Sequence, residues 1–397
     1  MDESVRQYTT ITTKPGTQMI DKFSRRDFLK LTGAGLGALF FNPLKPERSA
    51  LALPEFPAGD RLGRVFGKTD LRSEPSFSAP TVGTVYDDTI VVWQQEVITR
   101  GAVDPNIINQ RWVKTPDGFI YAPAVQPVRN VLNTPVTSIP NGAAGFWAEV
   151  TVPYVDTRVE GAAASPHVKF LLENNFPVRL YYSQVVWIDQ VAQADGAVYY
   201  RFNENGGRPP GVTGGSYGDL LWGEGSAFRL LTPDEVTPIH PDVDPATKKI
   251  IVDRTENYQY LSCLEGSEEV YFCRVSTGQY RDQFGNPVTD YLTPLGEHIT
   301  WRKALSIHMS GGTTGTGYDT PGISWTTLFS GEGYAIHGAF WHNNFGVPRS
   351  HGCVNCQPED AKWIFRWATP TNSLDQGDVQ VQLPVGGTHV IVQELSV

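Results

Sequence analysis

Ser350-His351-Gly352-Cys353-Val354-Asn355 is the most informative stretch of this 397-residue chain, and Ile336-His337-Gly338 precedes it by a short loop. A free thiol is only a few per cent ionised at neutral pH, so a nucleophilic cysteine needs a base or a positively charged neighbour. Both stretches supply a histidine whose imidazole could accept the thiol proton. The pattern therefore indicates an activated cysteine.

Acyl transfer by such a cysteine needs a nucleophile, a base and hydrogen-bond donors for the developing oxyanion. We expect Cys353 to be the nucleophile. We expect His337 to be the proton donor and acceptor, because a residue as close to Cys353 as His351 often points elsewhere in an extended or tight-turn segment. The backbone N–H groups of Gly352 and Cys353, together with His351, are expected to form the oxyanion hole. Gly352 allows a close approach of the backbone to the acyl carbon.

The C-terminal part of the chain, residues 248–397, resembles the catalytic domain of the L,D-transpeptidases. The resemblance covers a little over a third of the chain and implies a β-sandwich-like fold. A short docking helix is expected to begin at Gln357-Pro358, because Ala361, Ile364, Phe365 and Ala368 repeat at i, i+3, i+4 and i+7 and so form one apolar face. The resemblance also implies that the backbone carbonyl of Gly338 orients the base, so that no third carboxylate is required. The residues that carry it are the two stretches above and, in chain order, Ile250-Ile251-Val252-Asp253, Thr293-Pro294-Leu295-Gly296, His308-Met309 and Gly346.

The resemblance implies a reaction on the stem peptides of peptidoglycan without a cofactor or metal. Cys353 would attack the carbonyl of an L-centre in a tetrapeptide stem, release the terminal D-alanine and pass the acyl group to an amine, which gives a 3→3 cross-link. Water as the acceptor would give an L,D-carboxypeptidase, and a protein amine would give protein anchoring. Residues expected to bind the substrate are Tyr318, Met309, Trp341, Ser350 and Asn355, although aromatic residues in a β-rich protein are more often part of the core.

A second cysteine, Cys356, makes a Cys-x-x-Cys pair with Cys353. Three interpretations of Cys356 stay open, namely a packed core residue, a redox partner of Cys353 and a metal ligand. Zn²⁺ is typically bound by four Cys and His ligands. The alternative function is therefore a wall-binding or zinc-binding protein without activity, and the candidate ligands are His337, His342, His351, Cys353 and Cys356.

The other two cysteines, Cys263 and Cys273, flank the turn Glu265-Gly266-Ser267 of an expected hairpin. They could lie opposite each other and form a disulfide, or they could be two buried thiols. Four cysteines are too few for a disulfide scaffold in a chain of this length.

Residues 24–30, Ser-Arg-Arg-Asp-Phe-Leu-Lys, resemble the twin-arginine export signal. The apolar stretch 31–41 is too short to cross a hydrocarbon core of about 30 Å, and residues 50–52 form a small-x-small cleavage site. We therefore expect residues 1–52 to be a signal peptide and the mature protein to act in the periplasm or at the cell wall, with no permanent membrane span. The alternative is a basic pair before a buried helix.

Two regions precede the C-terminal unit. Residues 60–130 contain short β-branched and aromatic runs, with Pro116-Asp117-Gly118 as a hairpin turn. They resemble bacterial Src-homology-3-like barrels, and a generic β-module that only spaces the catalytic domain is the alternative. Residues 145–240 predict an uncertain β-rich module, either a second barrel or not a separate domain, with a short helix after Ser165-Pro166 and a linker at 238–245.

The composition places limits on the rest. Hydrophobic residues make up 40% and charged residues 19%, and Gly and Pro are plentiful, so we expect a mainly β protein with one or two small barrels before the catalytic domain. The formal net charge is −10, with eight Lys/Arg against five Asp/Glu in residues 1–52. The remaining chain is more acidic still, which argues against nucleic-acid binding. The oligomeric state is not predicted.

Overall fold

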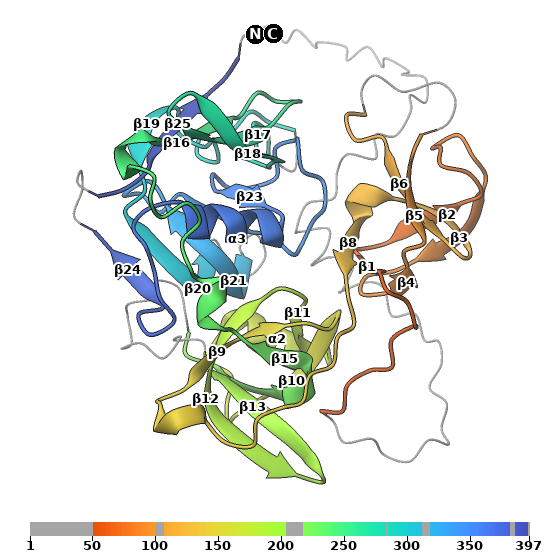
Figure 1. Ribbon diagram of the computed structural model, residues 1–397. Helices are drawn as coiled ribbons and strands as arrows, with labels where there is room; N and C mark the ends of the chain where they lie inside the picture. Colours follow the sequence, from red (N-terminus) through yellow and green to blue (C-terminus); the bar gives the residue numbers. More distant parts are fainter. Residues whose placement is uncertain are drawn as a thin grey trace, which may run out of the picture.

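The computed structural model describes residues 51–99, 107–203, 217–282, 285–311, 318–381 and 386–395. The twin-arginine motif at 24–30 and the apolar stretch at 31–41 lie outside these ranges. The described chain is mainly β, as predicted, with five sheets and two α-helices among the described residues. Figure 1 shows three units, which follow one another along the chain as an N-terminal, a middle and a C-terminal unit. Within these ranges, no helix is both long and apolar enough to cross a bilayer.

The N-terminal unit consists of two small sheets. The hairpin predicted at Pro116-Asp117 is confirmed, because Thr115 pairs with Gly118 across it. Apolar side chains from both sheets form a separate core. In spatial order the larger sheet contains β3 (Thr81–Val85), β2 (Thr69–Arg72), β7 (Gly118–Tyr121), β6 (Arg111–Thr115) and β5 (Gln95–Ile98). The smaller sheet contains β4 (Ile90–Val92), β1 (Leu62–Val65) and β8 (Val125–Val128).

The middle unit is a seven-stranded antiparallel sheet with one helix, α2 (Pro166–Glu173). The predicted start of this helix is confirmed. Ser165 is the N-cap and its Oγ accepts from the N–H groups of His167 and Val168, while Pro166 occupies the first turn, where its missing N–H costs nothing. In spatial order the strands are β11 (Val178–Tyr181), β10 (Tyr154–Val159), β14 (Leu220–Glu224), β13 (Ala197–Asn203), β12 (Val185–Ala194), β9 (Phe146–Val150) and β15 (Phe228–Leu230).

The C-terminal unit has two five-stranded sheets, and α3 (Pro358–Trp367) packs between them (Figure 1). The predicted face of this helix is confirmed, since Ala361, Ile364 and Phe365 are buried, and Trp367 joins them. The first sheet contains β18 (Glu268–Arg274), β17 (Tyr260–Glu265), β16 (Lys248–Asp253), β25 (His389–Gln393) and β19 (Gly296–Ile299). The second contains β23 (Val354–Cys356), β22 (Ala335–Gly338), β21 (Tyr318–Leu328), β20 (Arg302–Gly311) and β24 (Asp378–Gln380).

Two buried lysines hold the C-terminal end of α3. Lys248 Nζ donates to the carbonyl of Trp367 (3.0 Å), and Lys303 Nζ donates to that of Ala368 (2.7 Å). Cations are favourable at this end because the last carbonyls of a helix lack partners within it and carry its negative pole. Burial and the nearby charge of Lys248 lower the pKa of Lys303 to about 7. These contacts fix the helix that supports β22 and β23.

The hairpin predicted around Glu265-Gly266-Ser267 is confirmed as β17 and β18, and of the two alternatives for Cys263 and Cys273 the structure has the two buried thiols. Cys273 pairs with Leu261, and Cys263 pairs with Tyr271. Two residues therefore separate the cysteines along the ladder. Both side chains lie in the core as free thiols.

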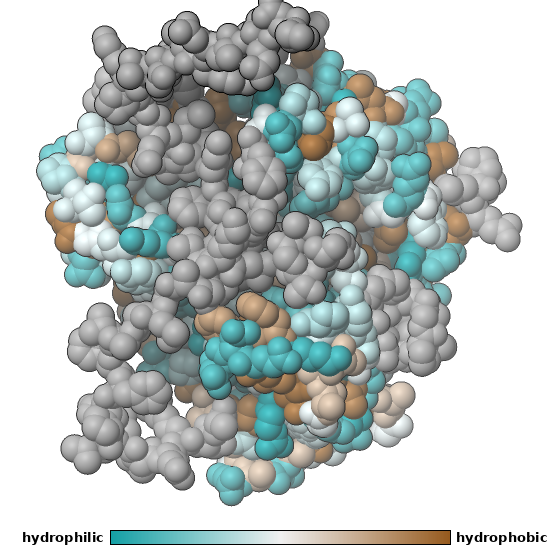
Figure 2. All heavy atoms as spheres, turned by 180° about the vertical axis from the view of Figure 1, so that it is seen from behind, coloured by the Kyte–Doolittle hydropathy of each residue, from teal (hydrophilic) through white to brown (hydrophobic). Residues whose placement is uncertain are grey.

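The surface carries both hydrophilic and hydrophobic side chains. Figure 2 shows, from behind, that hydrophilic and hydrophobic residues are interspersed over the described part of this face. Most of the buried apolar side chains belong to three clusters. The folded units are thus held mainly by apolar cores rather than by surface contacts.

Candidate active site

The candidate nucleophile and base are brought together by two parallel strands, β22 and β23. His337 is the register partner of Asn355. Because side chains alternate along a strand, Cys353, two residues before Asn355, belongs on the same face as Asn355 and His337. Val354 and Cys356 belong on the opposite face, where both are fully buried. The two candidate reacting groups therefore share one face of the sheet, and Cys356 does not.

His337 is held in one tautomer. Its side chain is 2% exposed, and its Nδ1 lies 3.0 Å from the backbone carbonyl oxygen of Gly338. A carbonyl can only accept, so Nδ1 carries the proton and Nε2 is left as the acceptor. An added Cβ at Gly338 would lie 2.9 Å from Ser324 Oγ, so a side chain there would require Ser324 to shift.

Ser350 braces the loop that carries Cys353. Its Oγ accepts from the N–H of Gly352 (3.0 Å) and donates to the carbonyl of Cys353. Gly352 has a φ of +118°, which side chains rarely adopt, and an added Cβ would lie 2.2 Å from Tyr334 Cε1. Glycine is thus required here by conformation and by space. The Gly352 amide, expected in the oxyanion hole, already has a partner in Ser350.

The segment after β18 pairs with both ends of this loop. The Ser350 N–H donates to Thr277 O (3.0 Å), and the Gln279 N–H donates to Ser350 O (3.0 Å). At the other end the Asn355 N–H donates to Ser276 O (2.8 Å). The nucleophile loop is therefore fixed by backbone hydrogen bonds on either side of Cys353.

A pocket opens over Cys353 and His337. Every residue predicted to bind substrate lines it. Ile323 and Arg349 line it as well, and neither was predicted, because one is an ordinary apolar strand residue and the other an isolated basic residue. The complete lining is Met309, Tyr318, Ile323, His337, Trp341, Arg349, Ser350, His351, Cys353 and Asn355.

His351 lies at the exposed side of the pocket between two tyrosines. Its ring meets that of Tyr291 edge-on at 4.3 Å and stacks on that of Tyr318 at 5.8 Å. Tyr291 was not predicted to lie at the site, since it belongs to no strand, helix or motif. The two tyrosines fix the ring plane of His351 beside the nucleophile loop.

The loop 339–345 forms one wall of the pocket through Trp341. The Trp341 ring centroid lies 5.7 Å from that of His337. Asn355 Nδ2 donates to Nε2 of His342 (3.0 Å), while Asn355 Oδ1 is buried with no hydrogen-bond partner among the described residues. Asn355 thus borders the pocket and braces the loop through His342, while its own oxygen is buried.

The N-terminal and middle units both contact this wall. Arg64 donates from Nη2 to Phe340 O (2.7 Å), and Asn343 donates from Nδ2 to Val125 O (2.9 Å). From the middle unit, the Tyr181 ring stacks on that of Phe340 at 5.6 Å. All three units therefore meet at the loop between the candidate base and the candidate nucleophile.

The β20–β21 hairpin, which carries Met309 and Tyr318, is tied to the middle unit. Asp319 accepts from Ser165 Oγ and forms an ion pair with His308. Burial alone would raise the pKa of Asp319, but the hydrogen bonds from His308 and Ser165 outweigh it and hold that pKa below its ordinary value. Gln184 Nε2 also donates to Pro321 O.

The second cysteine of the Cys-x-x-Cys pair is a core residue in this structure. Cys356 is fully buried beside Cys273, and burial raises the pKa of its thiol. None of the four cysteines forms a disulfide. Across the described ranges, no three His, Cys, Asp or Glu side chains are grouped so as to hold a metal ion.

Comparison with known proteins identifies the C-terminal unit. Residues 247–392 match the family description of the L,D-transpeptidase catalytic domain (YkuD). No curated protein matches the chain. The family match thus covers a little over a third of the chain and includes every candidate site residue.

Solved structures give weaker likenesses. An L,D-transpeptidase fragment (residues 123–326) from Xylanimonas cellulosilytica is 19% identical, with 37% of this chain and 61% of that one covered and a TM-score of 0.25. The catalytic domain of an E. faecium L,D-transpeptidase is 20% identical, with 37% and 96% covered and a TM-score of 0.27. An L,D-transpeptidase from Mycobacterium smegmatis is 19% identical, with 51% and 98% covered and a TM-score of 0.28. The chain spans less than two thirds of the length of the first of these chains.

Proposed function

We propose that this protein is a cell-wall L,D-transpeptidase in which Cys353 forms a thioester with a peptidoglycan stem peptide. One observation carries the proposal: Cys353 and His337 share one face of the β22–β23 pair at a pocket, with His337 Nδ1 held by the Gly338 carbonyl. The family match of residues 247–392 supports the same chemistry.

In the proposed acylation, His337 Nε2 takes the proton of the Cys353 thiol. The thiolate attacks the carbonyl carbon of the L-centre, and the carbonyl oxygen becomes an oxyanion. When the oxyanion collapses, the C–N bond breaks, His337 returns its proton to the leaving amine, and D-alanine departs. The acyl group is left on Cys353 as a thioester.

In the proposed second half, an amine of a neighbouring stem attacks the thioester. His337 takes a proton from that amine, the C–S bond breaks, and the thiolate of Cys353 recovers the proton. The product is an amide that joins two stems by a 3→3 cross-link. Water in place of the amine would make the enzyme an L,D-carboxypeptidase, and a protein amine would anchor that protein to the wall.

The donors for the oxyanion follow from the loop geometry. The N–H of Cys353 is the main donor, with His351 beside it. The Gly352 N–H contributes only if it is shared with Ser350 Oγ, its partner at 3.0 Å. Removing a single donor of this kind typically slows the reaction by about 10²-fold to 10³-fold.

The stem peptide is proposed to lie along the pocket, between the loop 339–345 and the β20–β21 hairpin. Trp341 and Tyr318 pack against the stem, Asn355 lines the pocket beside Cys353, and Arg349 offers a positive charge to a carboxylate. The proposed site of action is outside the cytoplasm, after export directed by residues 24–30. Stem peptides are present there.

The test compares three forms of the mature protein on a tetrapeptide stem, namely the parent, Cys353→Ala and Cys356→Ala. Released D-alanine and cross-linked product are measured by mass spectrometry, with and without an amine acceptor. We expect turnover by the parent and by Cys356→Ala, which removes a buried thiol only three residues away, and none by Cys353→Ala. Equal turnover by the parent and Cys353→Ala would overturn the proposal.

A further inference from the structure

Thr293 lies beneath the nucleophile loop, and the mechanism above does not use it. It is completely buried, and its Oγ1 donates to the carbonyl of Gly352 (2.7 Å). The same Oγ1 accepts from the N–H of Gly278 (3.0 Å). Thr293 is not among the described residues that line the pocket.

The two hydrogen bonds fix the direction of the hydroxyl. An N–H can only donate, so Thr293 Oγ1 must accept from Gly278, and its proton is left for the Gly352 carbonyl. This arrangement depends on a close approach, because an added Cβ at Gly278 would lie 1.7 Å from Tyr291 O and 2.8 Å from Thr293 N. The donor that faces Gly352 is therefore built into the packing of two segments far from it in sequence.

The carbonyl of Gly352 and the N–H of Cys353 belong to the same peptide group. In a planar trans peptide these two bonds point in opposite directions. The carbonyl is directed at Thr293, a buried residue outside the pocket lining, so the N–H is directed to the opposite side, where Cys353 borders the pocket.

Without this tether the peptide group would be easy to turn over. Gly352 has no side chain and a φ of +118°, so its own torsional preferences restrain the following peptide weakly. A flipped peptide would present the Gly352 carbonyl oxygen, instead of an N–H, to the negative charge of the oxyanion. That exchange replaces an attraction by a repulsion.

We propose that Thr293 is a positioning residue, which holds the Gly352–Cys353 peptide so that the Cys353 N–H faces the oxyanion. This inference rests on the proposed function, because only an acyl-transfer reaction forms that oxyanion. Thr293 touches no substrate and acts through the backbone of the nucleophile. It should therefore affect the stabilisation of the oxyanion and leave the activation of the thiol unchanged.

Two reactions of the same thiol separate these effects. Acylation of Cys353 by a carbapenem passes through an oxyanion. Alkylation by iodoacetamide displaces iodide at a saturated carbon and forms none. Both rates are measured by intact-protein mass spectrometry on the mature parent, Thr293→Val and Thr293→Ser. The valine variant keeps the shape but loses the hydroxyl, and the serine variant keeps it.

We expect Thr293→Val to slow acylation by about 10-fold to 100-fold, with the alkylation rate and its pH profile within about twofold of the parent. Thr293→Ser should restore acylation. If valine proves too destabilising because two buried polar groups lose their partner, Thr293→Ala gives room for a water in place of the hydroxyl and is measured instead.

Three results would contradict the proposal, and each has a different meaning. If acylation and alkylation fall by the same factor, the loop has merely lost order and the positioning role is wrong. The role is also wrong if acylation is unchanged. If the parent itself reacts with iodoacetamide at Cys353 but with neither a carbapenem nor a stem peptide, the proposed function fails, and the role of Thr293 fails with it.

Discussion

The middle and N-terminal units are joined to the C-terminal unit in different ways. Trp147, Leu231 and Val236 of the middle unit belong to the same apolar cluster as the core around α3. The N-terminal unit keeps a core of its own, built around residues such as Trp93 and Val113. A shared core makes two units fold as one body, whereas separate cores joined by hydrogen bonds fix an orientation between units that could each exist alone.

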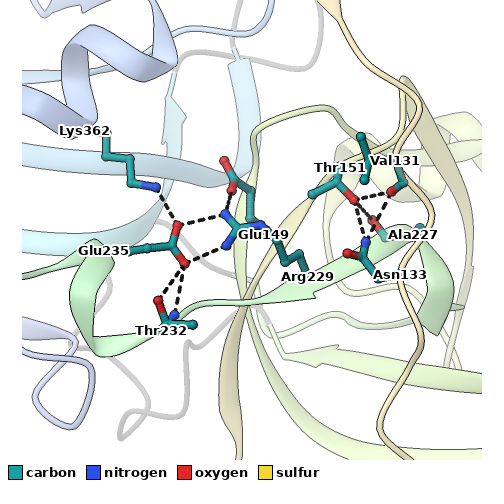
Figure 3. A network of polar contacts seen from close by, with 9 residues as sticks. All are labelled: Val131, Asn133, Glu149, Thr151, Ala227, Arg229, Thr232, Glu235 and Lys362. Carbon is teal, nitrogen blue, oxygen red and sulfur yellow. Dashed lines mark hydrogen bonds and ion pairs between the residues drawn. The ribbon is translucent and has the colours of Figure 1, made fainter. Parts of the chain in front are cut away.

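Polar groups surround the shared core. Figure 3 shows Lys362, on α3, reaching Glu235, which also pairs with Arg229. Arg229 in turn contacts Glu149 on β9. Glu235 also accepts from the N–H of Thr232 in a capping box (Figure 3). Lys362, Glu235, Arg229 and Glu149 together form a charged rim. This rim joins the middle unit to α3 beside the shared apolar core.

The contact between the N-terminal and C-terminal units is centred on one buried arginine. Arg64 is 2% exposed, pairs with Asp88 at 2.8 Å, and donates to Gln126 and to the carbonyl of Phe340. Its guanidinium also lies 4.1 Å from the ring centroid of Tyr181. The N-terminal unit therefore holds the active-site wall 339–345 through directional contacts.

The largest effect is expected from Trp147→Ala, which removes a large side chain from the shared core. Trp147 is 5% exposed and its Nε1 donates to Leu374 O at 3.1 Å. Removing a buried Trp leaves a cavity and typically costs about 3 to 5 kcal/mol. Urea unfolding followed by fluorescence and circular dichroism should show the transition of the middle and C-terminal units moving together to lower urea.

The control for this variant is Trp222→Ala, which removes a half-buried Trp from β14 of the same sheet and should cost much less. Two separate transitions for the middle and C-terminal units, already present in the parent, would show that the shared core does not couple them.

The next largest effect is expected at the contact between the N-terminal and C-terminal units. Arg64→Leu leaves Phe340 O without its donor and Asp88 with Arg179 as its remaining cation, which we expect to cost about 2 kcal/mol. Because Phe340 adjoins Trp341 in the pocket wall, kcat on a stem peptide should also fall several-fold. Arg72→Leu is the matched control, since Arg72 pairs with Asp70 within the N-terminal unit.

Steady-state kinetics and urea unfolding on both arginine variants check this prediction. If Arg64→Leu loosens the N-terminal unit while kcat stays at the parent value, that unit is an independent attachment and has no part in the active-site wall.

The sequence predicted the elements whose signals are local. The face of α3 follows from the spacing of Ala361, Ile364 and Phe365, and the hairpin at Pro116-Asp117 follows from its turn residues. The pocket residues were predictable because the resemblance to a family placed them, and the parallel pairing of β22 with β23 brings them together.

Long-range contacts were not predictable in this way. Nothing in the pattern around Arg64 indicates that its guanidinium reaches Phe340, 276 residues away. The arrangement of Cys263 and Cys273 depends on the register of β17 and β18, which turn length and residue type did not specify. The shared core around Trp147 depends on packing between units, and a Pro-rich stretch at 238–245 reads as a linker whether or not the cores on either side merge.

The smallest effect is expected from Glu235→Gln, which removes a charge from the rim of the shared core. Burial would raise the pKa of Glu235, but hydrogen bonds from Arg229 and Lys362 outweigh it and lower the pKa to about 2. A carboxylate with a depressed folded-state pKa stabilises the fold fully above its unfolded pKa of about 4.5, and this contribution is lost as the pH falls toward 2. The variant should be less stable than the parent by about 1 to 2 kcal/mol at pH 7, with the difference shrinking below pH 4.5.

Unfolding of the parent and Glu235→Gln across pH 2 to 7 measures this difference. Using the difference matters, because Glu149 in the same network has a pKa raised by burial and contributes the opposite slope in both proteins. Glu268→Gln, at an exposed position on β18, is the control and should leave the pH dependence unchanged. A difference that does not vary with pH would mean that the charges at the rim add nothing to the attachment, and that the apolar core alone joins the middle unit to α3.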